Sequence, residues 1–213
     1  MKSRESVQLS MKEYGLLYWV AVGVIALLVA SPFLSRVLVY PRTEFFTELW
    51  ILDADHRAEN YPFNVTRNQS YTIYLSVGNR LGYCAYYLVQ VKFRNQTQTA
   101  PTSFGPIESR LPSGLPSLFN MTVFVADEQV LEIPITFSFN YTWDEQFSKV
   151  KLSSLRLNGV ELNMSNCILS WDADEKAFRG FLFFELWLYN SSVNSFNYHG
   201  RFVGLWFNMT VTV

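Results

Sequence analysis

The chain has 213 residues, of which 49% are hydrophobic and 17% aromatic, and its formal net charge is −1. This composition is typical of a folded body with a buried core and not of a disordered chain. Lys and Arg form no clustered face interleaved with aromatic residues, so we expect no nucleic-acid partner.

The first predicted element is an apolar helix from residue 14 to residue 35. No side chain from Tyr14 to Ser35 carries a charge, and 22 helical residues span about 33 Å, enough to cross a hydrocarbon core. Tyr18 and Trp19 favour the headgroup level at one end, and Pro32 marks a point where a helix can stop. We expect an uncleaved membrane anchor. The alternative is a cleaved signal peptide, which typically has a shorter apolar region.

The charges that flank this helix say little about its orientation in the membrane. Lys2, Arg4 and Lys12 precede it, but Arg36 and Arg42 follow it. Because a cytosolic flank is marked by an excess of Lys and Arg, this small difference hardly decides the orientation.

The positions of the glycosylation acceptors predict the orientation of the helix in the membrane. The Asn-x-Ser/Thr pattern occurs eight times, always after the helix, where chance placement would give roughly two. The acceptors are Asn64, Asn68, Asn95, Asn120, Asn140, Asn163, Asn190 and Asn208. We therefore predict N-linked glycans and a cell-membrane protein with a cytosolic tail (1–13), a transmembrane helix (14–35), a juxtamembrane linker (36–42) and an extracellular domain (43–213).

Short β-type runs separated by turn residues fill the domain, and no convincing amphipathic helix interrupts them. The predicted strands are 45–52, 71–77, 83–94, 119–125, 130–139, 150–157, 167–171, 177–189 and 200–213. Eight or nine strands predict an all-β fold, an antiparallel sandwich.

The clearest run is 83–94. Its odd-numbered residues from Tyr83 to Phe93 are mostly apolar, while Gln90 and Lys92 lie on the opposite parity, which predicts a half-buried strand. Tyr86 also has the outward parity, so an exposed Tyr86 would suggest a contact surface.

Residues 96–118 hold four prolines and two glycines and are predicted to form a long loop. Such a loop either separates two β-modules or joins the sheets of one. About 53 residues of the domain precede it, too few for a comfortable core of their own, so we favour one sandwich.

Two further patterns each have two interpretations. Cys84 and Cys167 are predicted to form one disulfide, which would persist in an oxidising compartment outside the cell. The alternative is that they are two small buried thiols. The Asp-Ala-Asp segments that begin at Asp53 and Asp172 are predicted to be hairpin turns, in which Asp bonds its own backbone, and a calcium site is the less favoured alternative.

The sequence contains few residues or motifs that are typical of a catalytic site. The two histidines, His56 and His199, are predicted to be surface loop residues, and no nucleophile elbow, phosphate loop or zinc spacing occurs. We expect no enzyme activity, no metal and no cofactor. A glycosidase with paired carboxylates is the least favoured alternative.

Two segments carry a family resemblance: residues 47–66, with Trp-Ile-Leu-Asp-Ala-Asp-His-Arg-Ala-Glu, and residues 198–211, with Tyr-His-Gly-Arg-Phe-Val-Gly-Leu-Trp. They resemble the extracellular module of an archaeal membrane-protein family, a domain-of-unknown-function family (number sixteen-sixteen). The match covers both ends of the domain and not its middle, and that family often has several membrane helices. The resemblance implies an Ig-like or related sandwich on an archaeal surface, and no site residue.

The sequence thus suggests a non-enzymatic surface protein whose sandwich contacts other envelope or membrane proteins, glycans or copies of itself. The alternative is an accessory subunit of a larger membrane complex.

Overall fold

A computed structural model describes residues 2–37, 44–102, 104–165 and 167–211. It divides into two compact units, Met1–Glu44 and Phe45–Val213. The predicted juxtamembrane linker (36–42) lies largely outside the described residues.

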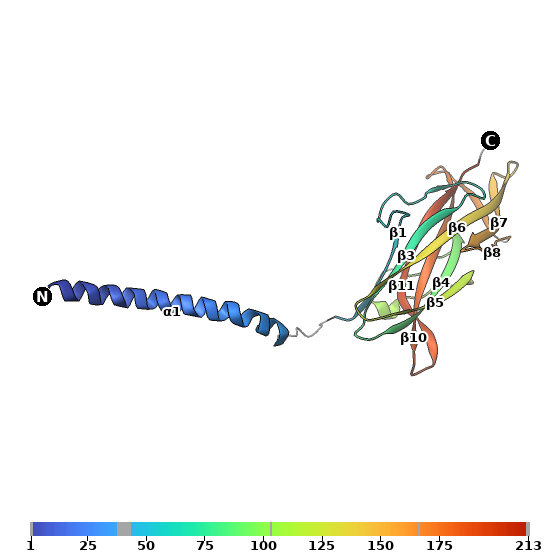
Figure 1. Cartoon of the computed structure of the whole chain (residues 1–213). Helices are drawn as coiled ribbons and strands as arrows, with labels where there is room; N and C mark the ends of the chain where they lie inside the picture. The colour runs from blue at the N-terminus through green and yellow to red at the C-terminus, as the bar shows by residue number, and fades with distance from the viewer. Residues whose placement is uncertain (1, 38–43, 103, 166, 212–213) are drawn as a thin grey trace. The chain divides into compact units, whose positions relative to one another are not determined.

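The first unit is one helix, α1 (Lys2–Val37), drawn in blue in Figure 1. Its stretch Tyr14–Phe33 has a mean hydropathy of 2.2 and is long and apolar enough to cross a membrane. The helix is longer at both ends than predicted. It includes residues 2–13, which were expected to form a tail. It also continues past Pro32, because a helix can tolerate an internal proline at the loss of one backbone hydrogen bond.

The second unit is all-β, as predicted, and every predicted strand region is present. The long strands are β1 (Phe46–Leu52), β3 (Tyr71–Arg80), β4 (Ala85–Asn95), β5 (Phe119–Val125), β6 (Val130–Asp144), β7 (Lys149–Leu157), β9 (Ile168–Asp172), β10 (Ala177–Asn190) and β11 (Ser195–Met209). Two strands were missed, β2 (Asn64–Val65) and β8 (Val160–Asn163). Strands of two and four residues are too short to show a period of two.

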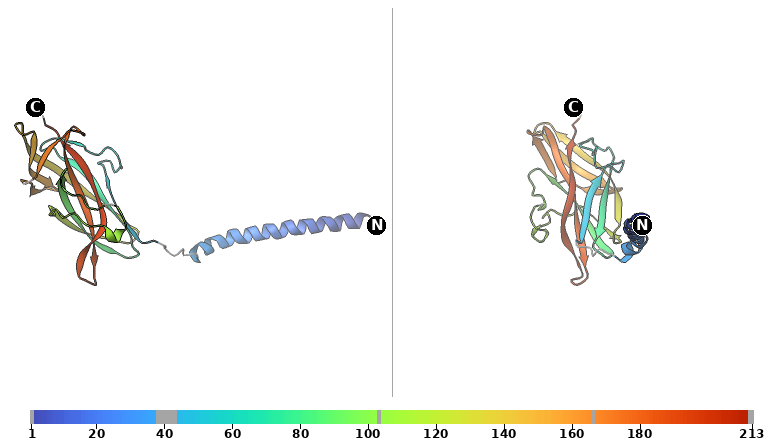
Figure 2. Two further views of the ribbon diagram at one scale, coloured as in Figure 1. Left: turned by 180° about the vertical axis from the view of Figure 1, so that it is seen from behind. Right: turned by 90° about the vertical axis from the view of Figure 1, so that its left-hand side faces the viewer.

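The strands form two layers (Figures 1 and 2). One layer has the order β1-β3-β6-β7, with β8 and β9 both paired to β7; the other has the order β5-β4-β10-β11-β2. Strand β9 also pairs with β10 and so connects the layers on one side, while β1 lies beside β11 on the other. All pairs are antiparallel except β2 with β11.

This order agrees in part with an immunoglobulin sandwich. Strands β1-β3-β6 and β4-β10-β11 correspond to A-B-E and C-F-G. The place of strand D, however, is taken by β7, which follows β6 in the chain.

The core fills the space between the layers. Alternate residues of β3, β6, β4 and β10 point inward, as the period of two requires. Fully buried members include Ile73, Leu75, Phe137, Phe139, Val89, Val91, Leu182, Phe184 and Phe207. A single continuous core includes strands from before and after the long loop, which agrees with one sandwich.

We expect Gly204→Ala to lower the free energy of unfolding by about 1–3 kcal/mol, the usual effect of overpacking. A Cβ at Gly204 would lie 2.6 Å from the Leu182 carbonyl oxygen and 2.6 Å from Phe183 Cβ. Gly114→Ala is the matched control, because its Cβ would meet nothing within 4 Å. Urea unfolding followed by tryptophan fluorescence measures both, and equal stability of the two variants would contradict this packing.

Candidate contact face

The outward face of the layer β4-β10-β11 carries an unusual number of aromatic and charged side chains. On β4 and β10 they lie two residues apart, and those of β11 are paired with outward residues of β10, so they share one face. The set is Tyr86, Leu88, Gln90, Lys92 and Arg94 of β4, Arg179, Phe181, Phe183, Glu185, Trp187 and Tyr189 of β10, and Phe196, Tyr198, Phe202 and Trp206 of β11.

A buried ion pair lies at the centre of this face. Lys92 Nζ lies 2.8 Å from Glu185 Oε2, and the two side chains are only 4% and 0% exposed. Ser113 completes the cluster, because its carbonyl oxygen accepts a hydrogen bond from Lys92 Nζ (2.9 Å) and its N–H donates to Glu185 Oε1 (2.6 Å). The prediction that β4 is only half-buried was therefore wrong at Lys92, where the long loop covers the outward face.

The described residues of the loop 96–118 form no strand, and the loop is held on the sheet at a second point. It contains one short 3-10 helix, η1 (Ile107–Ser109). Arg110 Nη1 donates to the carbonyl oxygen of Gly200 (3.2 Å) and its Nε donates to that of Gly105 (3.1 Å). Gly200 has φ +65°, and a Cβ there would lie 2.9 Å from Ile107 Cγ2, so glycine is required at this contact.

The loop exposes three large apolar side chains beside polar ones such as Glu108 and Ser109. Phe104 is 86% exposed, Leu111 67% and Ile107 44%. Exposed apolar side chains that form one patch are typical of a contact surface, whereas single ones are normal on any protein.

Two arginines flank one end of the face. Arg94 and Arg179 lie over the Trp206 ring, with guanidinium carbons 4.7 and 4.4 Å from its centroid. Arg94 also lies 5.2 Å from the Phe181 ring. Burial and the nearby Arg179 lower the pKa of Arg94. Arg179 additionally bonds Glu175 Oε1 (2.9 Å), so this end is a cation–π cluster that is already internally paired.

Tyr86 lies in an aromatic group at the other end of β4. Its ring stacks on Phe124, with centroids 4.2 Å apart and planes 9° apart, and it also meets Tyr189 and Phe196. Tyr86 itself is half-buried, whereas Phe124 is 69% exposed. Tyr86 therefore does not meet the condition of full exposure, and the exposed ring of this group is that of Phe124, its neighbour on β5.

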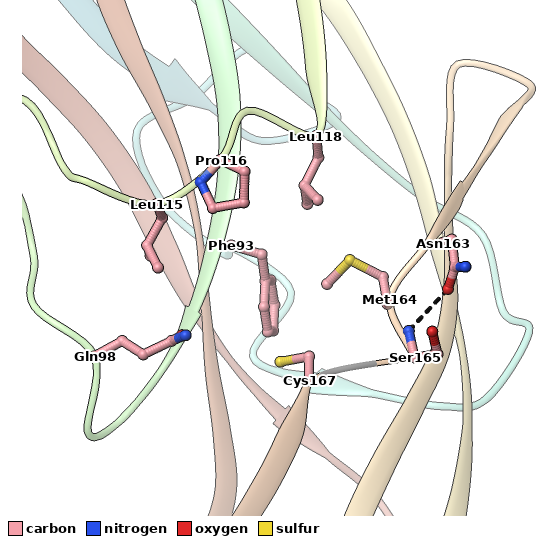
Figure 3. A pocket seen from close by; sticks show the side chains of 9 residues that line it. All are labelled: Phe93, Gln98, Leu115, Pro116, Leu118, Asn163, Met164, Ser165 and Cys167. Carbon is pink, nitrogen blue, oxygen red and sulfur yellow. Dashed lines mark hydrogen bonds between the residues drawn. The ribbon is translucent and has the colours of Figure 1, made fainter.

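A pocket of about 290 Å³ lies between the loop and the β8–β9 connection (Figure 3). Phe93, Met164 and Cys167 point into it, with Gln98 and Ser165 among its polar lining residues. Burial raises the pKa of Cys167 to about 11, so near neutral pH this thiol stays protonated and is a poor nucleophile.

The two cysteines lie near opposite ends of β4. Cys84 directly precedes Ala85, whereas Cys167 shares its pocket with Phe93. Eight residues of strand span about 26 Å, and a disulfide requires Cα atoms within about 7 Å. Both thiols are free in the structure, so the predicted bridge between them is not formed.

The histidines differ from each other. His56 is exposed in a turn, as predicted, where its Nδ1 lies 2.6 Å from Glu132 Oε2 and its ring stacks on Tyr74. His199 was predicted to be a surface loop residue, which was wrong, because β11 begins at Ser195 and carries it into a half-buried position. Its Nε2 lies 2.9 Å from Thr47 Oγ1, which in turn meets Tyr87 OH (3.0 Å).

Both Asp-Ala-Asp segments are turns, but only one is a hairpin turn. The segment at Asp172 joins the paired strands β9 and β10, as predicted, whereas the segment at Asp53 follows β1, which pairs with β3 and not with the next strand, so the predicted hairpin there was wrong. Asp53 Oδ1 accepts backbone hydrogen bonds from Asp55 (2.9 Å) and Arg57 (2.8 Å). Asp172 Oδ1 accepts from Asp174 (3.2 Å) and Glu175 (3.3 Å) in the same manner. The carboxylates of Asp53 and Asp172 therefore each accept backbone hydrogen bonds within their own turn.

The acceptor asparagines are unevenly placed. Six of them lie toward the end of the sandwich where β6 ends and β10 begins: Asn64, Asn68, Asn95, Asn140, Asn163 and Asn208. Asn120 lies beside the middle of β4, and Asn190 at the far end of β10. The side-chain amides of Asn95 and Asn208 already donate, to the Ile168 carbonyl (3.2 Å) and to Asn64 Oδ1 (2.9 Å).

We expect Lys92→Met to cost about 3–5 kcal/mol of unfolding free energy, because it leaves the Glu185 carboxylate buried without its cation. Urea unfolding measures this value. Lys151→Met is the matched control: Lys151 also lies 2.9 Å from a carboxylate, that of Asp144, but it is 52% exposed and solvent screens the pair. Equal effects of the two substitutions would contradict a central role for the buried pair.

A second prediction concerns pH. Burial, with a smaller contribution from Arg201, lowers the pKa of His199 to about 4 from its ordinary 6.5. The unfolded chain therefore binds this proton first, so the contribution of His199 to stability is complete above pH 6.5 and is lost as the pH falls toward 4. We expect His199→Gln to remove up to about 3 kcal/mol of this pH dependence. Parallel pH profiles for the wild type and the variant would contradict the assignment.

Comparison with known protein families finds no family model that matches this chain, and comparison with curated proteins finds no relative. The resemblance of the two domain ends to an archaeal surface family stays a prediction.

Proposed function

We propose that this chain is a single-pass, N-glycosylated cell-surface protein whose β-sandwich makes non-enzymatic contacts with other envelope proteins or glycans. The observation that carries the proposal is the loop 96–118, which is held by a buried polar cluster beneath it and exposes Phe104, Ile107 and Leu111 above it.

The anchor and its orientation rest on different observations. The stretch Tyr14–Phe33 has the length and apolarity of a membrane span. The acceptors all follow it in sequence, and five of the eight are exposed: Asn64, Asn68, Asn120, Asn163 and Asn190. This supports an extracellular domain, because N-linked sugars are added on the non-cytosolic side.

A contact role fits the chemistry of the face better than catalysis does. Two pairs of its charged groups are internal, Lys92 with Glu185 and Arg179 with Glu175, and Arg94 Nη1 donates to the carbonyl oxygen of Gln98 (2.7 Å). Three large apolar side chains of the loop, those of Phe104, Ile107 and Leu111, are exposed, and apolar and aromatic anchors at the centre of a patch carry most of the affinity in protein interfaces.

The alternative, an accessory subunit of a membrane complex, is favoured by a different group of residues. Phe45, Phe46, Tyr83, Val130 and Val193 are all at least 41% exposed. They lie toward the end of the sandwich at which the chain enters β1. Partner chains packed around a membrane span could cover such a surface.

Topology is tested by protease protection on sealed cells or vesicles, combined with a glycosidase mobility shift. We expect protease added outside to degrade the domain, and glycosidase to increase its mobility. Degradation only after the membrane is opened, with no shift, would contradict the proposed orientation.

The contact face is tested by photo-crosslinking in intact cells. A photoreactive residue replaces Phe104 in the loop, or Phe147, which is 61% exposed in the β6–β7 connection and serves as the control. We expect discrete crosslinked bands from position 104 and none from position 147. The same pattern from both positions would contradict a specific face on the loop.

A further inference from the structure

Strand β5 is the end strand of its layer. It pairs with β4 along one edge, from Phe119 opposite Val91 to Val125 opposite Ala85. In the described part of the chain no strand pairs with its other edge. Alternate residues of β5 therefore direct backbone N–H and C=O groups away from β4.

The sequence of β5 gives this edge no ordinary protection. Phe-Asn-Met-Thr-Val-Phe-Val contains no charge and no proline, and it is rich in β-branched and aromatic residues. Proteins commonly protect exposed edges with lysine, proline, bulges or very short strands, because an open edge pairs readily with another chain. At seven residues, β5 has none of these features.

The edge does carry one of the glycosylation acceptors. Asn120 is the second residue of β5, it is exposed, and its pattern is completed by Thr122. Asn120 Oδ1 accepts a hydrogen bond from Ser117 Oγ (2.6 Å), and the amide nitrogen, which would carry the sugar, is not part of that bond.

Two of the other three end strands also carry a glycosylation acceptor. Asn64 lies in β2 and Asn163 in β8, each the last strand of its branch. The fourth end strand, β1, carries no acceptor, but it includes Glu48 and lies beside β11. Among the described strands, the three end strands other than β1 each hold a glycosylation acceptor.

We propose that a glycan on Asn120 shields the open edge of β5 and prevents it from pairing with β5 of a second copy. The inference rests on the proposed glycosylation of the domain. A second copy fits this edge because antiparallel pairing of one strand with itself is a two-fold, self-complementary contact. Such a pair would place Phe124 of each copy close to the edge of the other, covering a ring that is 69% exposed.

The test compares the mass of full-length variants in detergent micelles, by light scattering corrected for detergent, after expression in an N-glycosylating host. Asn120→Gln and Thr122→Ala both remove the acceptor pattern, so we expect a twofold rise in protein mass for each. Thr122→Ser keeps the pattern and Asn190→Gln removes a different acceptor, so both should match the monomeric wild type.

One further variant separates the edge from the glycan. Asn120→Lys also lacks the sugar but places a charge on the strand, so we expect it to stay monomeric. Thermal unfolding checks that each variant is folded. Dimers of the wild type or of Asn120→Lys, or monomers of both Asn120→Gln and Thr122→Ala, would overturn the inference.

Peptide mapping of the wild type separates this inference from the proposed function. A sugar on Asn120 is expected. A bare Asn120 in a chain glycosylated elsewhere would overturn the shielding of β5 alone, whereas eight bare acceptors would overturn the proposed glycoprotein itself.

Discussion

The contact between Lys92, Glu185 and Ser113 is the interaction on which the outer surface of the domain depends. Removing two opposite charges from water is costly, and the pair is tolerated because the ions are 2.8 Å apart and the backbone of Ser113 supplies further hydrogen bonds. Those backbone bonds require the loop to lie on the sheet. The polar cluster thus determines where the loop lies, and the loop determines which apolar side chains face solvent.

The two ends of the sandwich carry different kinds of surface. Six acceptor asparagines lie toward one end of the sandwich, while the exposed Phe45, Phe46 and Tyr83 lie toward the other end, where β1 begins. Sugars on the first group would keep that end hydrated, and the loop and the opposite end remain available for protein contacts.

Much of the fold could be predicted from the sequence because most strands show their period of two. The odd residues of β4 identified its inner face, and the proline-rich composition identified the loop. Strands β2 and β8 were missed because two to four residues hold no period. The start of β11 was placed five residues late, and His199 was therefore assigned to a loop.

The candidate face was harder to foresee because it depends on contacts between distant residues. Lys92 and Glu185 are 93 positions apart, and neither has a local pattern that indicates burial. Two cysteines in a domain expected outside the cell predicted a bridge, but Cys84 precedes the start of β4, whereas Cys167 precedes β9 and lies beside Phe93 near the other end of β4. Tyr86 was identified by parity alone, whereas its partner Phe124 emerges only from the pairing of β4 with β5.

The most direct test of the account is hydrogen exchange of the Ser113 amide, measured by mass spectrometry with fragmentation to single residues. If the loop is held on the sheet, this N–H donates to buried Glu185 and exchanges slowly, while amides near Phe104 exchange fast. Fast exchange at Ser113, equal to that of the rest of residues 96–118, would contradict the account.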